Sequence, residues 1–303
     1  MIALRIFSYL PNPRIWKATM AARLCGTEVE VRGASPGELS QWLWDFDARP
    51  ITEVMPELLA TTERTGRVGF SKSKLYKTDA FLEAQPFGTV PAAFSPDGRT
   101  GIFESNSIMR TVARLGQDRF PLYGGDAYEA SRIDGFLDAS LVFARDAQIY
   151  LLALRDGSIS TELHARAQES FQSYLSGTEQ ALTPRRKFLV GNDVTLADIC
   201  YVAELCLFHN EHARRTTLDA VGLQPVLRGD SPAPIRCPAS IFMIFSCIRP
   251  LCRMSRVTWK RSRHRFDYSL AALTKTTTRR HRERCAYRTP LHDQGRTGTG
   301  QGG

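Results

Sequence analysis

Apolar and polar positions at the start of the chain alternate with two different periods. Residues 3–9 form a short β-like run, which the prolines of residues 10–13 break. Residues 14–25 place apolar side chains at helical spacing, and Gly26 marks the end of that helix. Residues 28–32, Glu-Val-Glu-Val-Arg, alternate and predict a second strand. A strand, a helix and a strand in this order predict two parallel strands joined by a crossover.

A second strand pattern lies in residues 87–106. Val90-Pro91 ends an extended segment, and a proline suits the head of a strand because it has no N–H to give the ladder. The turn at Ser95-Pro-Asp-Gly98 separates two strands, and Glu104-Ser105-Asn106 closes the second one before an amphipathic run. A β-α-β opening followed by a β-β-α closing predicts an α/β thioredoxin-like N-terminal domain over residues 1–115.

The stretch between these two halves has more residues than one helix and a loop require. We therefore interpret residues from about 33 to 80 as an insertion. Trp42-Leu-Trp-Asp-Phe46 groups three aromatic side chains, which we expect to pack in a core rather than to cover a ligand. Residues 61–74 are polar and contain Gly66 and Gly69, so they predict an exposed loop.

Residues 127–225 have helical periods and predict an all-α C-terminal domain. Thr161 to Leu182 predicts an amphipathic helix that ends near Thr183-Pro184. Thr195 followed by Asp198 has the spacing of a capping box, so we interpret Asp198 as structural despite its likeness to a catalytic acid. The segment from Tyr128 to Arg155 is predicted to turn one apolar stripe inward, at mixed three- and four-residue intervals: Ile133, Phe136, Leu137, Leu141, Ile149, Leu152 and Ala153.

Two features of residues 87–106 predict a site for a peptide carboxylate. If the Val90–Pro91 bond is cis, Val90 turns its backbone polar groups outward, where an extended ligand can pair with them. Glu104 and Ser105 stand where a strand ends and a helix begins, so free N–H groups and a hydroxyl can hold a carboxylate. The alternative is an ordinary β-hairpin with a Pro-Asp-Gly turn.

Together these residues resemble the glutathione-binding half of the cytosolic glutathione transferases. The wording Phe-Gly-Thr-Val-Pro-Ala, followed by Ile-Phe-Glu-Ser-Asn-Ser-Ile, is similar to the transferase-like domain of the gamma subunit of translation elongation factor 1. The resemblance covers about residues 1–225. It implies that the backbone of Val90, before a cis Pro91, pairs with the cysteinyl part of glutathione. It also implies that Glu104 and Ser105 hold the γ-glutamyl end.

The same resemblance implies a hydroxyl donor that stabilises the glutathione thiolate. The serine position of serine-type members falls on Pro11, which has no donor. Tyr9 is our first candidate, with Ser8 and Asn12 behind it, and Arg14 adds a cation for glutathione binding. Ser8 and Tyr9 alternate, so only one of them can line a cleft. The alternative is that none of them activates a thiol and the domain only binds.

Two functions follow from this resemblance. The first is an enzyme that adds the thiolate of glutathione, its co-substrate, to small electrophiles in an apolar pocket between the two domains. The second is a non-catalytic module that binds translation-factor partners. The resemblance also implies a homodimer. No Cys-x-x-Cys follows the first strand, which argues against a dithiol reaction.

The last 78 residues hold the whole basic excess of the chain. Residues 226–303 contain 16 basic and 4 acidic residues, a net charge of +12, against +9 for the full chain. Three interpretations remain open. In the first, this irregular tail is a disordered arm that binds RNA or another polyanion. In the second, the tail results from a reading-frame error that replaces the end of the helical domain. The third is a zinc-binding appendage that uses Cys237, Cys247, Cys252, Cys285, His264 and His281.

Cysteine usage and hydropathy bear on the compartment. Seven cysteines without a closely spaced framework do not suggest a secreted disulfide scaffold. The first residues predict a strand rather than a signal peptide, and no apolar run reaches transmembrane length. We therefore expect a cytoplasmic protein that binds no membrane and needs no metal.

Overall fold

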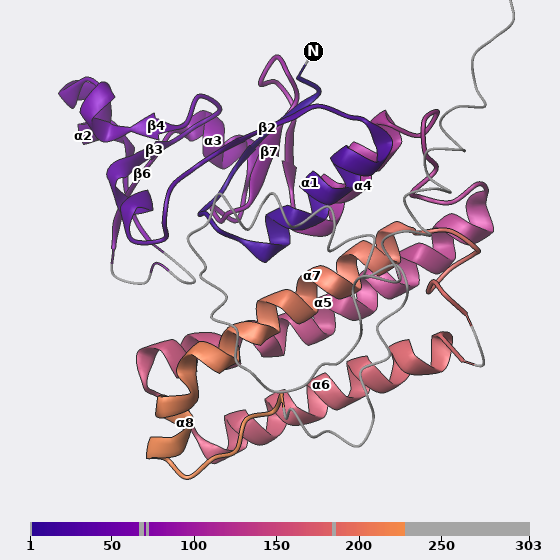
Figure 1. The fold of residues 1–303 in the computed structure, drawn as a ribbon. Coiled ribbons are helices and arrows are strands. Elements are labelled where there is room, and N and C mark those ends of the chain that lie inside the picture. The colour runs from indigo at the N-terminus through magenta and orange to yellow at the C-terminus, as the bar shows by residue number, and fades with distance from the viewer. Residues whose placement is uncertain (1, 67–69, 71–72, 184–185, 228–303) are drawn as a thin grey trace, which may run out of the picture. The chain divides into compact units, whose positions relative to one another are not determined.

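The described chain contains two sheets, the second inserted between strands of the first, and a set of helices that follows them (Figure 1). The computed structural model describes residues 2–66, 70, 73–183 and 186–227, and these all belong to one compact unit. The predicted tail, with its zinc ligands and basic residues, lies outside the described residues apart from Val226 and Leu227. The domain bounds expected from the sequence stay predictions.

The first sheet and its helices have the predicted thioredoxin-like order. The elements are β1 Leu4–Phe7, α1 Pro13–Cys25, β2 Val29–Arg32, β7 Ala92–Phe94, β8 Gly101–Phe103 and α4 Ser105–Leu115. The strand order is β2-β1-β7-β8, with β1 parallel to β2 and antiparallel to β7, and β7 antiparallel to β8. The α/β fold expected for this half is therefore confirmed.

Helix α1 begins and ends at residues that cap it. Asn12 Oδ1 accepts a hydrogen bond from the backbone N–H of Arg14 at 3.0 Å, and Pro13 occupies the first turn. Gly26 ends the helix in the left-handed region, at φ +66°, and its N–H donates to the carbonyl of Ala22. Helix α1 packs against α4 and also against α7, Leu196–Phe208, so it contacts both halves of the fold.

The insertion forms a second four-stranded sheet. Its elements, with the helix that follows it, are η1 Glu38–Gln41, β3 Trp42–Trp44, β4 Arg49–Pro50, η2 Ile51–Glu53, α2 Pro56–Thr62, β5 Glu63–Thr65, β6 Lys74–Lys77 and α3 Asp79–Ala84. The strand order is β4-β3-β6-β5. The prediction of an exposed loop over residues 61–74 is wrong for β5, which pairs with β6 in an antiparallel register. The hydrogen bonds of that pair stabilise a polar strand that has no apolar alternation of its own.

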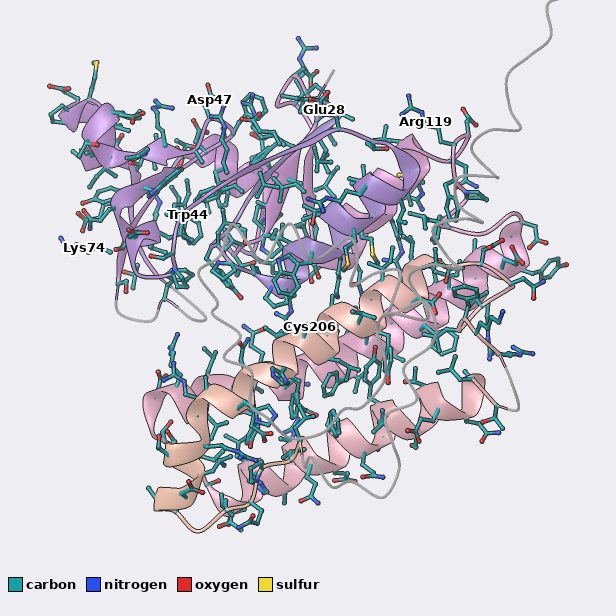
Figure 2. All side chains as sticks on the ribbon, in the orientation of Figure 1. Glu28, Trp44, Asp47, Lys74, Arg119 and Cys206 are labelled. Carbon is teal, nitrogen blue, oxygen red and sulfur yellow. The ribbon has the colours of Figure 1, made fainter. Side chains whose placement is uncertain are left out.

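Trp44 lies in a small aromatic core beside the second sheet (Figure 2). Its side chain is 1% exposed, and its ring lies 5.6 Å from Phe7, 5.5 Å from Phe70 and 5.8 Å from Phe81. Since Phe7 belongs to β1, this cluster joins the insertion to the first sheet. The packing role predicted for the aromatic segment is confirmed for Trp44, which in addition lines a cavity beside the first sheet.

Helices form the rest of the described chain. They are α5 Ala127–Asp156, α6 Thr161–Ala181, α7, η3 His209–Arg214 and α8 Arg215–Ala220. Figure 1 shows α5, α6 and α7 running side by side, and α5 packs against both of the others. The all-α half of the fold is therefore confirmed.

The capping box predicted before α7 is confirmed. The backbone N–H and the hydroxyl of Thr195 donate to Asp198 Oδ2 at 2.9 and 3.2 Å, and Leu189 N–H donates to Oδ1 at 3.0 Å. Asp198 is fully buried. Burial raises the pKa of Asp198 to about 6, although the hydrogen bonds from Thr195 and Leu189 oppose that rise. Asp198 therefore has a structural role, since its carboxylate caps the buried start of α7.

Candidate functional site

A cavity of about 720 Å³ lies between the first sheet, the insertion and helices α5 and α7. Its volume is in the range of small-molecule sites. On the thioredoxin-like side it is lined by all but one of the site residues predicted from the sequence: Tyr9, Asn12, Arg14, Val90, Pro91, Glu104 and Ser105. Residues that are far apart in the sequence therefore share one cavity.

Val90 presents an open stretch of backbone to this cavity. The Val90–Pro91 bond is cis, and β7 begins at the next residue, Ala92. Within the described part of the chain, neither the N–H nor the C=O of Val90 has a hydrogen-bond partner. An extended ligand can therefore pair with both groups, as a strand pairs with a sheet edge.

Glu104 and Ser105 stand at the start of α4, on the same cavity. Glu104 has φ +66° and ψ 126°, a conformation that costs about 1–3 kcal/mol for a residue with a side chain. Ser105 is the first residue of the helix and is 6% exposed. The first N–H groups of a helix have no partner inside the helix and favour an anion. A carboxylate in the cavity can take these N–H groups together with the Ser105 hydroxyl.

The three candidates for thiol activation differ in burial and in whether they line the cavity. Tyr9 is partly buried and lines the cavity, and burial raises the pKa of Tyr9 while Arg14 opposes that rise. Tyr9 therefore keeps its hydrogen and can donate it to a thiolate. Asn12 also lines the cavity, and its Nδ2 donates to Ser8 Oγ at 3.1 Å. Ser8 is fully buried and does not line the cavity, so a direct role for Ser8 is wrong: it supports Asn12 instead.

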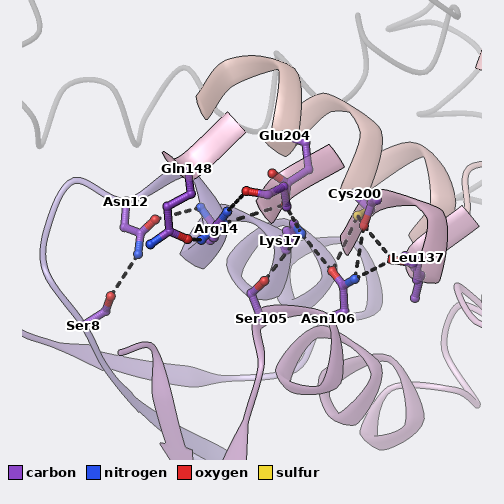
Figure 3. Close-up of polar contacts among 12 residues, drawn as sticks. Ser8, Asn12, Arg14, Lys17, Ser105, Asn106, Leu137, Gln148, Cys200 and Glu204 are labelled. Atoms are coloured by element: carbon purple, nitrogen blue, oxygen red, sulfur yellow. Dashed lines mark hydrogen bonds and ion pairs between the residues drawn. The ribbon is translucent and has the colours of Figure 1, made fainter. Parts of the chain in front are cut away.

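Arg14 connects the two halves of the cavity wall. Its Nη1 donates to Gln148 Oε1 at 2.8 Å and its Nη2 to the carbonyl of Ala144 at 3.2 Å, both on α5 (Figure 3). Binding of glutathione by Arg14 stays a prediction. The structure shows that Arg14 contacts α5. The sequence did not suggest this contact, because Gln148 and Ala144 are more than 100 positions away along the chain.

A buried polar network that the sequence did not reveal lies behind Ser105 (Figure 3). Lys17 Nζ on α1 donates to Glu204 Oε1 on α7 at 2.6 Å and to Asn106 Oδ1 at 2.8 Å. Asn106 Nδ2 in turn donates to the carbonyl of Leu137 on α5 at 2.9 Å. The available signal was that apolar residues flank Lys17 in α1 and Glu204 in α7, since buried charges of this kind are normally paired.

Helices α5 and α7 supply an apolar wall opposite the peptide motif. The apolar residues that line the cavity there are interspersed with Arg145, Gln148, Arg155 and Glu204; they are Leu141, Ala144, Ile149, Leu151, Leu152 and Leu207. Leu141 is 42% exposed and Ile149 is 41% exposed, so the prediction that both turn inward is wrong. Helix α5 has two apolar faces: one packs in the core with Ile133 and Leu137, and the other lines the cavity. The predicted stripe combined residues of these two faces into one.

Metal and membrane binding find no support in the described residues. Over these ranges, no group of three or more His, Cys, Asp or Glu side chains is placed to hold a metal ion. Similarly, no helix in the described part of the chain has the length and apolar character needed to cross a bilayer.

Comparisons with known proteins found relatives of two kinds. No family model matches the chain. An elongation factor 1-gamma from Arabidopsis thaliana is 33% identical over 147 residues, which cover 43% of this chain and 31% of that protein. Glutathione S-transferase F9 from the same plant is 31% identical over 134 residues, which cover 42% of this chain and 61% of the transferase. The chain thus spans less than a third of the elongation factor and about three-fifths of the transferase.

Solved structures share the fold. A glutathione S-transferase from Methylobacillus flagellatus, solved with glutathione bound, has a TM-score of 0.53 over 82% of this chain and 98% of its own. At 14% identity this likeness concerns the fold alone. The chain therefore has the glutathione transferase fold, and in sequence it is similar to elongation factor 1-gamma and to a glutathione S-transferase.

Proposed function

We propose that this protein binds glutathione in the cavity and adds its thiolate to a small electrophile. The observation that carries the proposal is the meeting, in one cavity, of open backbone at Val90, a helix start at Ser105 and the Tyr9 hydroxyl. In this arrangement Val90 pairs with the cysteinyl part of glutathione. Glu104 and Ser105 hold the γ-glutamyl end, and the thiol then lies near Tyr9.

The chemistry requires a thiolate and an apolar place for its partner. A hydrogen bond from Tyr9 lowers the pKa of the glutathione thiol, and the released proton goes to solvent. The thiolate sulfur then forms a bond to the electrophilic carbon; with an aryl halide, the carbon–halogen bond breaks and the halide ion leaves to solvent. Leu141, Ile149 and Leu207 give that carbon skeleton an apolar wall within the same cavity. We place the protein in the cytoplasm as a homodimer.

The direct test is a calorimetric titration of glutathione into the full chain. Ser105→Ala removes one donor to the ligand carboxylate and is expected to weaken binding about 10- to 100-fold. Tyr9→Phe is expected to leave binding intact and to lower conjugation of an activated aryl halide about 100-fold. A folded wild-type protein that does not bind glutathione would overturn the proposal.

A second candidate function is a binding module without catalysis. Its support is the similarity to elongation factor 1-gamma and the absence of a donor at Pro11. In this case the protein surface binds translation-factor partners, whether or not the cavity binds glutathione. Conjugation at the uncatalysed rate, unchanged by Tyr9→Phe, would favour this function over the enzyme.

A further inference from the structure

A fully buried ammonium group lies directly behind Ser105. The Lys17 side chain has no exposed surface, and its Nζ donates to Glu204, to Asn106 and, at 3.4 Å, to Ser105 Oγ. These three bonds use all three hydrogens of the ammonium group. Burial alone favours the neutral amine, but interactions with Cys200 and with the Glu204 carboxylate together outweigh it and raise the pKa of Lys17. Lys17 is therefore charged at neutral pH.

The bond from Lys17 decides what the Ser105 hydroxyl can offer. A hydroxyl has one hydrogen to donate and two lone pairs that accept, whereas an ammonium group can only donate. Ser105 Oγ therefore accepts from Lys17 and keeps its own hydrogen. Among the described residues no acceptor takes that hydrogen, and Ser105 lines the cavity. A ligand carboxylate there meets a free O–H donor with a positive charge behind it.

We propose that Lys17 is a positioning residue for the carboxylate subsite. By donating to Ser105 Oγ it turns the Ser105 hydrogen toward the ligand, while Glu204 holds Lys17 in place from the helical half. The proposal rests on the proposed binding of glutathione and adds to it. The group that it recognises is the α-carboxylate of the γ-glutamyl residue.

Glu204 makes this subsite depend on both halves of the fold. The Glu204 side chain is 1% exposed, and only its Oε1 contacts Lys17. Its Oε2 is buried and has no hydrogen-bond partner in the described part of the chain. Oε1 also lies 3.9 Å from Arg14 Nε, so the 2.6 Å contact with Lys17 is the shorter of its two ion pairs. If the pair served only to join α1 to α7, its removal would affect every ligand of the cavity equally.

The test separates these roles with two variants and two ligands. Lys17→Met alone leaves the Glu204 carboxylate buried without its partner and is expected to unfold easily. The double variant Lys17→Met/Glu204→Leu removes both charges and is expected to fold. The ligands are glutathione and an analogue in which 4-aminobutanoate replaces the γ-glutamyl residue, so that only the α-carboxylate is missing. Lys74→Met removes one exposed positive charge away from the cavity and is the matched control (Figure 2).

We expect the double variant to bind glutathione about 10- to 100-fold more weakly than wild type, with the affinity for the analogue changed less than about twofold. Adding Ser105→Ala to the double variant is expected to weaken binding little further, because the two groups act as one unit. Equal losses for both ligands, or no loss for glutathione, would overturn the role of Lys17. Absence of glutathione binding by wild type is a different result, which overturns the proposed function and this inference with it.

Discussion

The two walls of the cavity are built in different ways. The thioredoxin-like wall uses backbone and short motifs, with Val90-Pro91 and Glu104-Ser105 lying within 16 consecutive positions. The helical wall uses side chains from distant positions of α5 and α7, such as Leu141 and Leu207. Recognition by backbone leaves a signal in the local sequence. Recognition by packed side chains depends on how the helices are placed, and leaves almost none.

The largest expected effect concerns the contact that joins the two walls. Lys17→Met leaves the Glu204 carboxylate buried without its ammonium partner, which typically costs about 3–5 kcal/mol of stability. The double variant with Glu204→Leu is expected to recover most of that loss. Urea unfolding followed by circular dichroism measures both. If the single variant were as stable as wild type, the Lys17–Glu204 pair would contribute nothing to the joining of the two walls.

A second prediction concerns Asp198 at the start of α7, the helix that contributes to the helical wall. Because Asp198 has a pKa of about 6 in the folded protein against an ordinary 3.8, its ionisation favours the unfolded state. Its contribution to the free energy of unfolding is therefore complete below about pH 4 and falls by about 3 kcal/mol as the pH rises to 6.

Asp198→Asn removes this titration. The difference in unfolding free energy between wild type and Asp198→Asn, measured from pH 4 to pH 7, should shrink as the pH rises. A difference that grows instead would mean that the hydrogen bonds from Thr195 and Leu189 stabilise the carboxylate more than burial disfavours it.

A third prediction separates the two walls by function. Ile149→Ser on α5 removes apolar surface from the helical wall, and we expect kcat/KM for an apolar electrophile to fall about 10-fold. The Kd for glutathione should stay within about twofold of wild type, since the peptide side is untouched. Val142→Ser, on the same helix but 69% exposed and away from the cavity, is the control. Loss of glutathione affinity in Ile149→Ser would contradict the division of roles.

The smallest effect is expected for Arg14. Arg14→Lys keeps the charge but loses the fork that reaches both Gln148 and Ala144, which typically costs about 1 kcal/mol. We expect a drop of a few degrees in the thermal midpoint and a modest loss of glutathione affinity. This result would indicate that Arg14 mainly holds the two walls together. A large loss of affinity would show that Arg14 contacts the ligand directly.

Most of the elements were predictable because their signals are local. The capped helix from Pro13 to Cys25, the hairpin at Ser95-Pro-Asp-Gly98 and the capping box at Thr195 each depend on residues within a few positions of one another. Strand β5 escaped prediction because its polar residues are stabilised by pairing with β6. The direct role expected for Ser8 failed because strand alternation cannot tell which side of the sheet is filled by other elements.

By itself the sequence determined the thioredoxin-like order, the helical half and the peptide motif at Val90 and Ser105. Only the tertiary structure decided that Lys17 meets Glu204, 187 positions away, and that Ile149 turns toward the cavity rather than the core. The physical reason is the range of the interactions. Caps, turns and strand periods are fixed by neighbours along the chain, whereas a buried ion pair or a second helix face is fixed by packing between elements.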